Sequence, residues 1–198
     1  MTRLSAEINI EGTICEISDN LINIQFSGQD RSDPTLPSWG IKSNSGSLEM
    51  YDTDESIKKA SEQGLLANSP VNIYLNVGDR KEQLGGFYVV GANQDKQTHK
   101  TTIEFQDALM SWQQKQMPKY YNFDATKVAN INNIISSITS LNVSDGNTGS
   151  RILSLFINYP QIKEGSLWSQ MGKICELGSF YIYCDEYGIP TIHYSGDT

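Results

Sequence analysis

This 198-residue sequence contains two histidines, a residue type that can act as an acid, a base or a metal ligand. His99 and His193 lie in different halves of the chain, each in a segment expected to be a strand with hydroxyl residues nearby. Either could serve a site formed by folding, but surface or hairpin histidines are the expected interpretation. The sequence contains neither G-x-S-x-G nor H-E-x-x-H. These observations favour a protein that is not an enzyme.

The three cysteines are the next candidates for metal binding. Cys15, Cys175 and Cys184 cannot all pair with one another, and none belongs to a C-x-x-C motif. A structural zinc site needs about four ligands at close spacing, whereas the histidine nearest to Cys184 is the solitary His193. We therefore expect reduced cysteines in a hydrophobic core, with no metal and no cofactor.

Two pairs of acids have spacings that could suggest binding or catalysis. Asp52 and Asp54 begin like a calcium loop, but the sixth position is Ile57 instead of glycine and the twelfth is Gln63 instead of glutamate. The adjacent acids at 185–186 lie in a predicted turn, where neighbouring side chains point apart, so they do not indicate a glycosidase pair. The sequence thus predicts neither a calcium site nor a two-carboxylate active site.

The chain as a whole is acidic, with 15 Lys and Arg against 23 Asp and Glu and a net charge of −8. Affinity for nucleic acid comes mostly from cations on phosphates, so no sequence-specific nucleic-acid binding is expected. The 38% hydrophobic content is typical of a globular protein. Because the sequence contains no run of ~18 apolar residues, no membrane-spanning segment is expected.

The first half of the chain has the period-two pattern of antiparallel strands. Apolar and polar residues alternate in the segments 22–26, 71–77 and 101–105, at strand spacings typical of barrels and sandwiches. A short helix is expected between the first two of these strands, capped by Asp54 and running through Gln63. The pattern predicts a closed or nearly closed antiparallel β-barrel or sandwich with one flanking helix.

The pattern changes after residue 106. Residues 107–116 are predicted to form a helix that Pro118 stops. We therefore expect two domains, a β domain of residues 1–118 and a smaller α+β unit of residues 119–198. The predicted fold class is α+β, mainly β.

The smaller unit is predicted to contain two helices, a strand and a hairpin. A helix is expected at 126–141, a strand at 152–157, a second helix after the capping residue Ser166, and a hairpin of 180–184 with 189–194. The second helix has an apolar stripe at three- and four-residue steps, formed by Leu167, Met171, Ile174 and Cys175.

A long loop at 28–44 contains two prolines and Trp39. A connection of this length without predicted secondary structure is usually functional or an interaction arm. Trp39 could fill the protein's own core, anchor a neighbouring subunit or stack on a sugar. The candidate subunit-interface residues of this arm are Leu36, Pro37, Trp39 and Ile41.

Two stretches resemble the hub proteins at the base of bacteriophage tails and of related contractile injection machines. In 164–194 the resemblance lies in SLW, GSFYIY and DEYGIP. In 39–114, GSLEMYD, VNIYL, LGGFYVV and TTIEFQDALMSWQ follow in the order of tail-hub and tail-tip proteins. These are packing patterns, and the family has no catalytic residues to carry over. Because a hub would continue after Tyr194 into a second barrel, the chain is expected to be the N-terminal portion of a longer hub or a compact relative.

The resemblance implies a tail-tube-like β-barrel followed by the α+β unit, in a structural virion protein assembled in the bacterial host cytoplasm. Such barrels assemble side by side, so a homo-oligomeric ring of three or six copies is expected, with other tail and baseplate proteins as partners. DNA would pass through the ring during ejection, and carboxylates on its wall would not retain phosphates. The alternative is a β-rich carbohydrate-binding adhesin or receptor-binding module, suggested by ten tyrosines and three tryptophans.

Overall fold

The chain contains two compact units, each with its own sheet and core. The computed structural model describes residues 2–28, 40–95, 97–116, 165–178 and 180–194. The first unit consists of residues 1–28, 44–107 and 185–188, and the second of residues 29–43, 108–184 and 189–198. The units are therefore interleaved along the sequence. The predicted boundary between residues 118 and 119 lies outside the described residues and stays a prediction.

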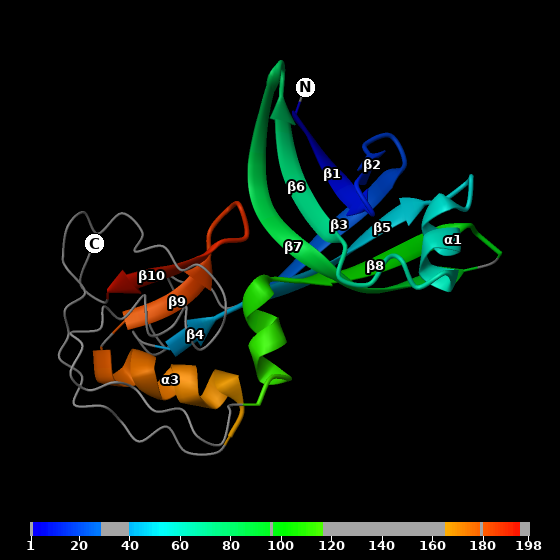
Figure 1. Cartoon of the computed structure of the whole chain (residues 1–198). Coiled ribbons are helices and arrows are strands. Elements are labelled where there is room, and N and C mark those ends of the chain that lie inside the picture. The colour runs from blue at the N-terminus through cyan, green and yellow to red at the C-terminus, as the bar shows by residue number, and fades with distance from the viewer. Residues whose placement is uncertain (1, 29–39, 96, 117–164, 179, 195–198) are drawn as a thin grey trace. The chain divides into compact units, whose positions relative to one another are not determined.

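A seven-stranded antiparallel sheet forms most of the first unit (Figure 1). Its order is β2-β1-β6-β7-β8-β5-β3, so β2 and β3 are the edge strands. The strands are β1 (Thr2–Ile10), β2 (Thr13–Ile17), β3 (Leu21–Gly28), β5 (Asn44–Tyr51), β6 (Pro70–Val77), β7 (Arg80–Asp95) and β8 (Lys100–Gln106). The long strand β7 pairs first with β6 and then with β8 and bends between them (Figure 1). The predicted mainly-β, antiparallel architecture is confirmed.

The core of the first unit lies on one face of this sheet, because buried and exposed side chains alternate along its strands. Leu48 and Ile103 lie opposite each other on β5 and β8 and have no exposed surface. Two residues further along, Phe105 lies opposite Gly46, and its ring centroid is 4.8 Å from that of Phe87. The buried core residues are Ala6, Ile8, Ile17, Leu48, Met50, Ile57, Ala60, Leu66, Val71, Ile73, Phe87, Val89, Ile103 and Phe105.

Helix α1 (Ser56–Glu62) follows β5, where a short helix was predicted. Its first turn is capped by Asp52, whose carboxylate accepts the backbone N–H groups of Ile57 at 3.3 Å and Lys58 at 2.9 Å. The predicted cap, Asp54, instead accepts the Ser56 N–H at 3.2 Å, within its own turn. Asp52 has no exposed surface, so the cap anchors α1 to the end of β5.

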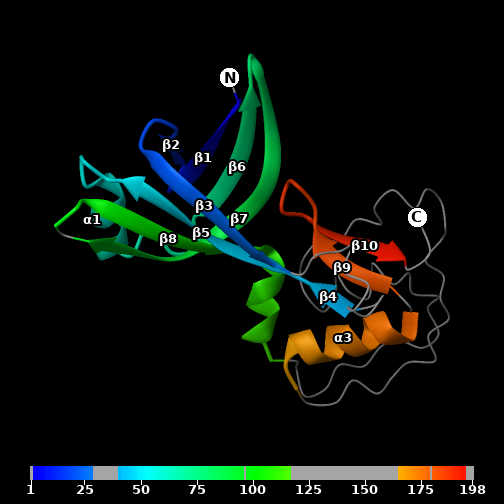
Figure 2. The same ribbon diagram turned by 180° about the vertical axis from the view of Figure 1, so that it is seen from behind.

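A three-stranded sheet and helix α3 form most of what the structure describes of the second unit, as both ribbon views show (Figure 2). The sheet has the order β10-β9-β4, in which β9 and β10 form an antiparallel hairpin and β4 runs parallel to β9. The described elements of this unit are β4 (Gly40–Lys42), the 3-10 helix η1 (Ala108–Gln113), α3 (Leu167–Gly178), β9 (Phe180–Cys184) and β10 (Pro190–Tyr194). The predicted stripe of α3 is buried in the core of this unit. Ser166 caps α3 as predicted, because its hydroxyl accepts the Ser169 N–H at 3.2 Å.

Two segments of the second unit have a secondary structure that differs from the predicted one. The predicted loop at 28–44 ends in β4, a strand of three residues that is too short to show a period and is set by pairing with β9. The predicted helix at 107–116 is the shorter η1, whose three-residue turn places Leu109 and Trp112 on one side. Both side chains have no exposed surface and belong to the core of the second unit.

The alternation predicted at 22–26 is interrupted at the start of β3. A bulge between Leu21 and Asn23 shifts the register, and the side chain of Ile22 is 39% exposed. The sequence pattern did not reveal the extra residue because Ile22 continues the alternation with Ile24. The helix predicted at 126–141 and the strand predicted at 152–157 lie outside the described residues.

Candidate functional site

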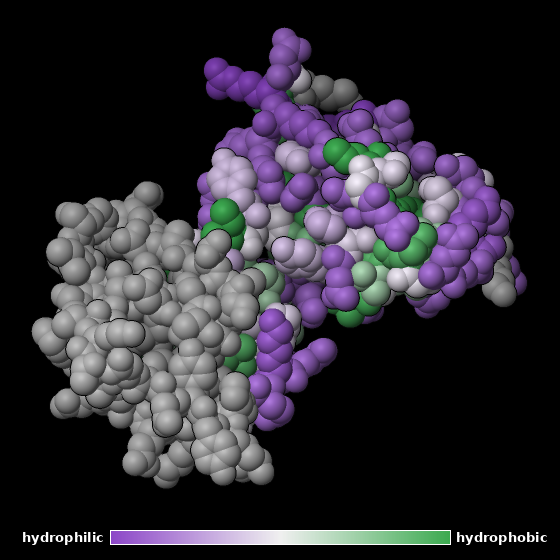
Figure 3. Space-filling model, viewed as in Figure 1, coloured by the Kyte–Doolittle hydropathy of each residue, from purple (hydrophilic) through white to green (hydrophobic). Residues whose placement is uncertain are grey.

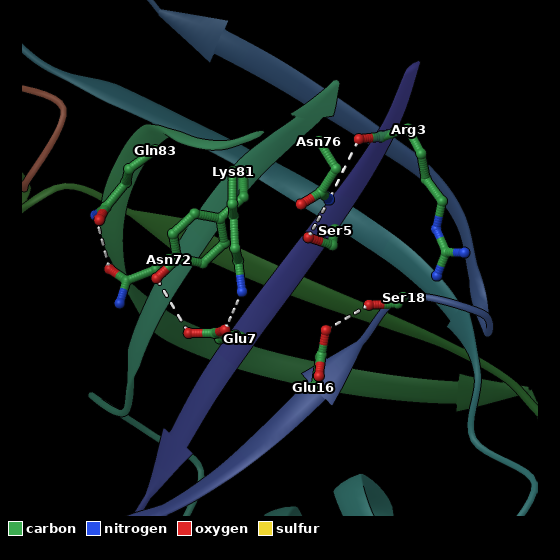
Figure 4. Close-up of polar contacts among 10 residues, drawn as sticks. Arg3, Ser5, Glu7, Glu16, Ser18, Asn72, Asn76, Lys81 and Gln83 are labelled. Carbon is green, nitrogen blue, oxygen red and sulfur yellow. Dashed lines mark hydrogen bonds and ion pairs between the residues drawn. The ribbon is translucent and has the colours of Figure 1, made fainter. Parts of the chain in front are cut away.

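The outer face of the seven-stranded sheet, opposite its core, carries a network of three side chains (Figure 4). Glu7 of β1 forms an ion pair with Lys81 of β7, across the intervening strand β6. The hydroxyl of Tyr74 on β6 donates a hydrogen bond to Glu7 Oε2 at 3.0 Å. The Lys81 Nζ lies 4.2 Å from the centroid of the Tyr74 ring. The tyrosine thus contacts both charges and links three strands.

The contacts of this network shift the pKa values of its three side chains. The hydrogen bond from Lys81 lowers the pKa of Glu7 below its ordinary value, and the same bond raises the pKa of Lys81. Burial, together with the hydrogen bond to Glu7, raises the pKa of Tyr74. Glu16 lies directly opposite Glu7 on β2, so Lys81 also offsets a repulsion between two carboxylates.

Replacing Lys81 with methionine is expected to lower the free energy of unfolding by about 0.5–1 kcal/mol at neutral pH, because the pair is partly exposed. The lowered pKa of Glu7 means that its contribution is present above the unfolded carboxyl pKa and is lost as pH falls through the folded value. The raised pKa of Lys81 means that its contribution is present below the unfolded ammonium pKa and is lost as pH rises through the folded value.

The difference in free energy of unfolding between the unchanged protein and Lys81→Met should therefore be largest between about pH 5 and pH 10. It should shrink at lower and at higher pH. Urea unfolding of both proteins at several pH values measures it. Lys115→Met, which removes an exposed lysine, is the control and should show no such profile. A loss of stability at Lys81→Met that does not depend on pH would contradict the ion-pair account.

The outer face of β3, β5 and β8 carries nine side chains that we call the polar grid. They lie in three cross-strand rows, Asn23–Glu49–Thr102, Gln25–Ser47–Glu104 and Ser27–Ser45–Gln106. The grid contains two carboxylates and no lysine or arginine. A hollow of about 420 Å³ at these strands is lined by grid residues, among them Ser45 and Ser47, and also by Phe26 and Phe105 from the core side. The hydrophilic surface of the described part of the first unit is visible in Figure 3. The grid offers hydroxyl, amide and carboxylate groups, but no cation for phosphate.

The candidate interface residues are only partly described by the structure. Ile41 lies on β4 opposite Ile182 of β9, and its side chain is 7% exposed within the core of the second unit. Leu36, Pro37 and Trp39 lie outside the described residues. Their assignment to a subunit interface therefore stays a prediction, and the structure adds that the arm ends in a strand fixed to its own chain.

The histidines and cysteines are divided between the two units, with His99 and Cys15 in the first and His193, Cys175 and Cys184 in the second. His99 belongs to the first unit, where its backbone carbonyl accepts the Asp52 N–H at 3.0 Å. His193 belongs to the second unit, with its ring centroid 5.1 Å from that of Tyr181. Cys15 and Cys175 are free thiols, and burial raises the pKa of the Cys175 thiol strongly. Within the described ranges, no three His, Cys, Asp or Glu side chains are grouped to hold a metal ion, and no helix is long and apolar enough to span a membrane.

Comparison with known proteins finds similarity in structure but not in sequence. No protein-family model and no curated protein matches the chain by sequence. The tail protein from Neisseria meningitidis matches with a TM-score of 0.56 and 8% identity, over 96% of this chain and 50% of that one. The 43 kDa tail protein of prophage MuSo2 from Shewanella oneidensis matches with a TM-score of 0.51 and 8% identity, over 99% of this chain and 54% of that one. A chain of the half-lidded Francisella PdpA–VgrG complex matches with a TM-score of 0.58 and 15% identity, over 98% of this chain and 31% of that one.

This chain thus spans about half the length of the two tail proteins and 31% of the Francisella chain. At such low identities the similarity concerns the fold alone. It nevertheless extends over nearly the whole chain, and so over both stretches whose sequence resembles tail-hub proteins. The protein has the tail- and baseplate-like fold of bacteriophage tail proteins.

Proposed function

We propose that the protein is a structural component of a phage tail or of a related contractile injection machine, located at the hub or baseplate. The observation that carries this proposal is the tail-protein fold, which covers 96% and 99% of the chain in the two comparisons with tail proteins. The protein would then be a virion component, assembled in the host cytoplasm together with other tail and baseplate proteins. Its role would be mechanical and not catalytic.

Within this role, copies of the chain assemble into a closed ring of three or six subunits. The two edge strands of the sheet support this, because an edge presents backbone groups that can pair with another chain. Each edge also carries an exposed apolar side chain, since Ile14 on β2 is 63% exposed and Phe26 on β3 is 51% exposed. Exposed apolar groups beside an open edge are suited to contact a second subunit.

The arm that contains Trp39 is the second part of the proposed interface. β4 fixes the C-terminal end of this arm, and the buried side chain of Ile41 holds β4 in the core of the second unit. An arm anchored at its end loses less conformational entropy when it binds a neighbour than a free segment does. We therefore assign the neighbour contact to Leu36, Pro37 and Trp39 and the anchoring to Ile41.

The ring would surround a channel through which DNA passes, and we place the polar grid on the channel side. Its two carboxylates and its lack of cations suit a wall that does not retain phosphates. The net charge of −8 of the chain also repels DNA phosphates, over longer distances than the grid does. A cationic wall would bind DNA and slow its passage.

Light scattering of the purified protein tests the assembly through its mass in solution. The expected mass is three or six times that of one chain, and Trp39→Ala should shift it toward the single chain. Tyr187→Ala is the matched control, because it removes an aromatic side chain that is 63% exposed but lies outside the arm. A single-chain mass at every concentration would count against the ring. If that monomer also bound glycans on an array, the adhesin function would replace the proposed one.

A further inference from the structure

A groove lies between β1 and the first half of β3, away from the residues assigned to the ring contact. Its volume is about 550 Å³, and we call it the β1–β3 groove. One side is formed by residues 2–4 of β1, and the other by residues 21–24 of β3 together with Ser18 and Asp19, which precede that strand. All of these residues belong to the first unit.

The backbone edge of β1 lacks a strand partner along this groove. On one side β6 pairs with β1 from Thr2 to Ile8, whereas on the other side β2 pairs with it only from Ala6 to Ile10. Among the described strands, residues 2–5 therefore have a free edge, about 13 Å long at the rise of a β-strand. This free edge lies on the side of β2, from which the chain passes directly into β3.

The edge of β3 on the opposite side of the groove is free as well. β3 pairs with β5 and is the last strand of the sheet, so its other edge has no partner among the described strands. Residues 21–24 contain no charged residue and no proline, with which edge strands commonly prevent further pairing. The groove is thus bordered by two strand edges whose backbone N–H and C=O groups can pair with another chain.

The side chains at the groove favour an uncharged, partly apolar occupant. Leu21 and Ile24 are half-buried against the core of the first unit, and the bulge in β3 leaves Ile22 39% exposed. Only Arg3 and Asp19 of the lining residues are charged, and Arg3 Nη2 lies 2.6 Å from Asp19 Oδ1. Because these two charges offset each other, the groove selects neither an anion nor a cation.

We propose that the β1–β3 groove binds an extended, uncharged segment of a different polypeptide, with apolar side chains at alternate positions. The backbone of this segment pairs with the free edges of β1 and β3, and its apolar side chains cover Leu21 and Ile24. Each described strand already pairs on at least one side, so none of them in a second copy has two free edges to offer. The groove is independent of the ring, since Ile14 and Phe26 do not line it.

Titration with an end-blocked Thr-Val-Thr-Val-Thr peptide, followed by nuclear magnetic resonance, tests the groove. The peptide should shift the backbone amide signals of residues 2–5 and 21–24 saturably. The N–H groups of alternate residues in a strand point to opposite edges, so N-methylated valines remove the donors of one edge and N-methylated threonines those of the other. Either methylated peptide should bind at least tenfold more weakly. Undiminished binding of either one would overturn pairing on both edges.

Ile22→Lys is the test variant, because it places a charge in the groove at an exposed position. It should weaken binding of the peptide at least tenfold, while an unchanged amide signal of the buried Ile103 shows that the first unit is folded. Leu84→Lys is the matched control, because Leu84 is also the extra residue of a bulge and is 42% exposed but does not line the groove. The control should bind the peptide like the unchanged protein.

Light scattering during the titration separates a different polypeptide from a second copy as the occupant. The mass of the protein's assembly should stay the same as the peptide fills the groove, because the ring contacts lie elsewhere. A fall in this mass would show that a second copy occupies the groove and would overturn the assignment to a different polypeptide. Absence of saturable shifts, or equal peptide binding by the two lysine variants, would overturn the site itself.

Discussion

Replacing Gly46 with alanine is expected to lower the free energy of unfolding by about 2–3 kcal/mol, a large effect for a single methyl group. A Cβ at this position would lie 2.2 Å from the backbone oxygen of Gln25 and 2.7 Å from Cζ of Phe105. Both distances are far shorter than van der Waals contact, so the strand or the ring must move. The Phe105 ring lies 4.8 Å from that of Phe87, so its displacement would disturb the core.

Chemical denaturation of Gly46→Ala measures this loss. Gly91→Ala is the matched control, because Gly91 also lies in the seven-stranded sheet but its added Cβ would meet no atom within 4 Å. The control should change stability by less than about 0.5 kcal/mol. In a Phe105→Leu background, Gly46→Ala should cost less stability than it does in the unchanged protein, because the clash with the Phe105 ring is gone. It should still cost some stability, because the clash with the Gln25 backbone oxygen remains. Equal stability of the two alanine variants would contradict the close packing of Phe105 on Gly46.

Replacing Ile182 with alanine is expected to cost about 3 kcal/mol in the stability of the second unit. Ile182 has no exposed surface and lies at the centre of its sheet, opposite Ile41 on β4 and Ile192 on β10. Its truncation would leave a cavity that three strands and α3 border.

Because the two units have separate hydrophobic cores, this loss should be confined to one of them. Hydrogen exchange should show faster exchange of amides in α3 and β9, with unchanged protection at Ile103 in the first unit. Ile189→Ala, in the same hairpin but 44% exposed, is the control and should leave both units unchanged. Equal acceleration in both units would show that they unfold as one.

The sequence predicted best those elements whose pattern is local. The alternation at 71–77 identified β6, and the alternation at 101–105 identified β8 with its buried face. The stripe at Leu167, Met171 and Ile174 identified α3, because a helix brings residues three and four apart together. In each case a single segment contains the whole signal.

Features set by pairing between distant segments could not be predicted in this way. β4 is a strand because of its parallel pairing with β9, about 140 residues later in the chain. The polar grid depends on β3 and β8 both pairing with β5, which no spacing within one strand reveals. The cap of α1 by Asp52 likewise depends on how β5 ends, and the local rule selected Asp54 instead.

Electron microscopy of the purified protein tests the central claim most directly, since it shows the assembly itself. Averaged particle images should show rings of threefold or sixfold symmetry around a central channel, and Trp39→Ala should reduce the number of rings. The Gly91→Ala protein, which is expected to fold normally, should form rings like the unchanged chain. Images that contain only single-chain particles at every concentration would contradict the assignment of this fold to a tail ring.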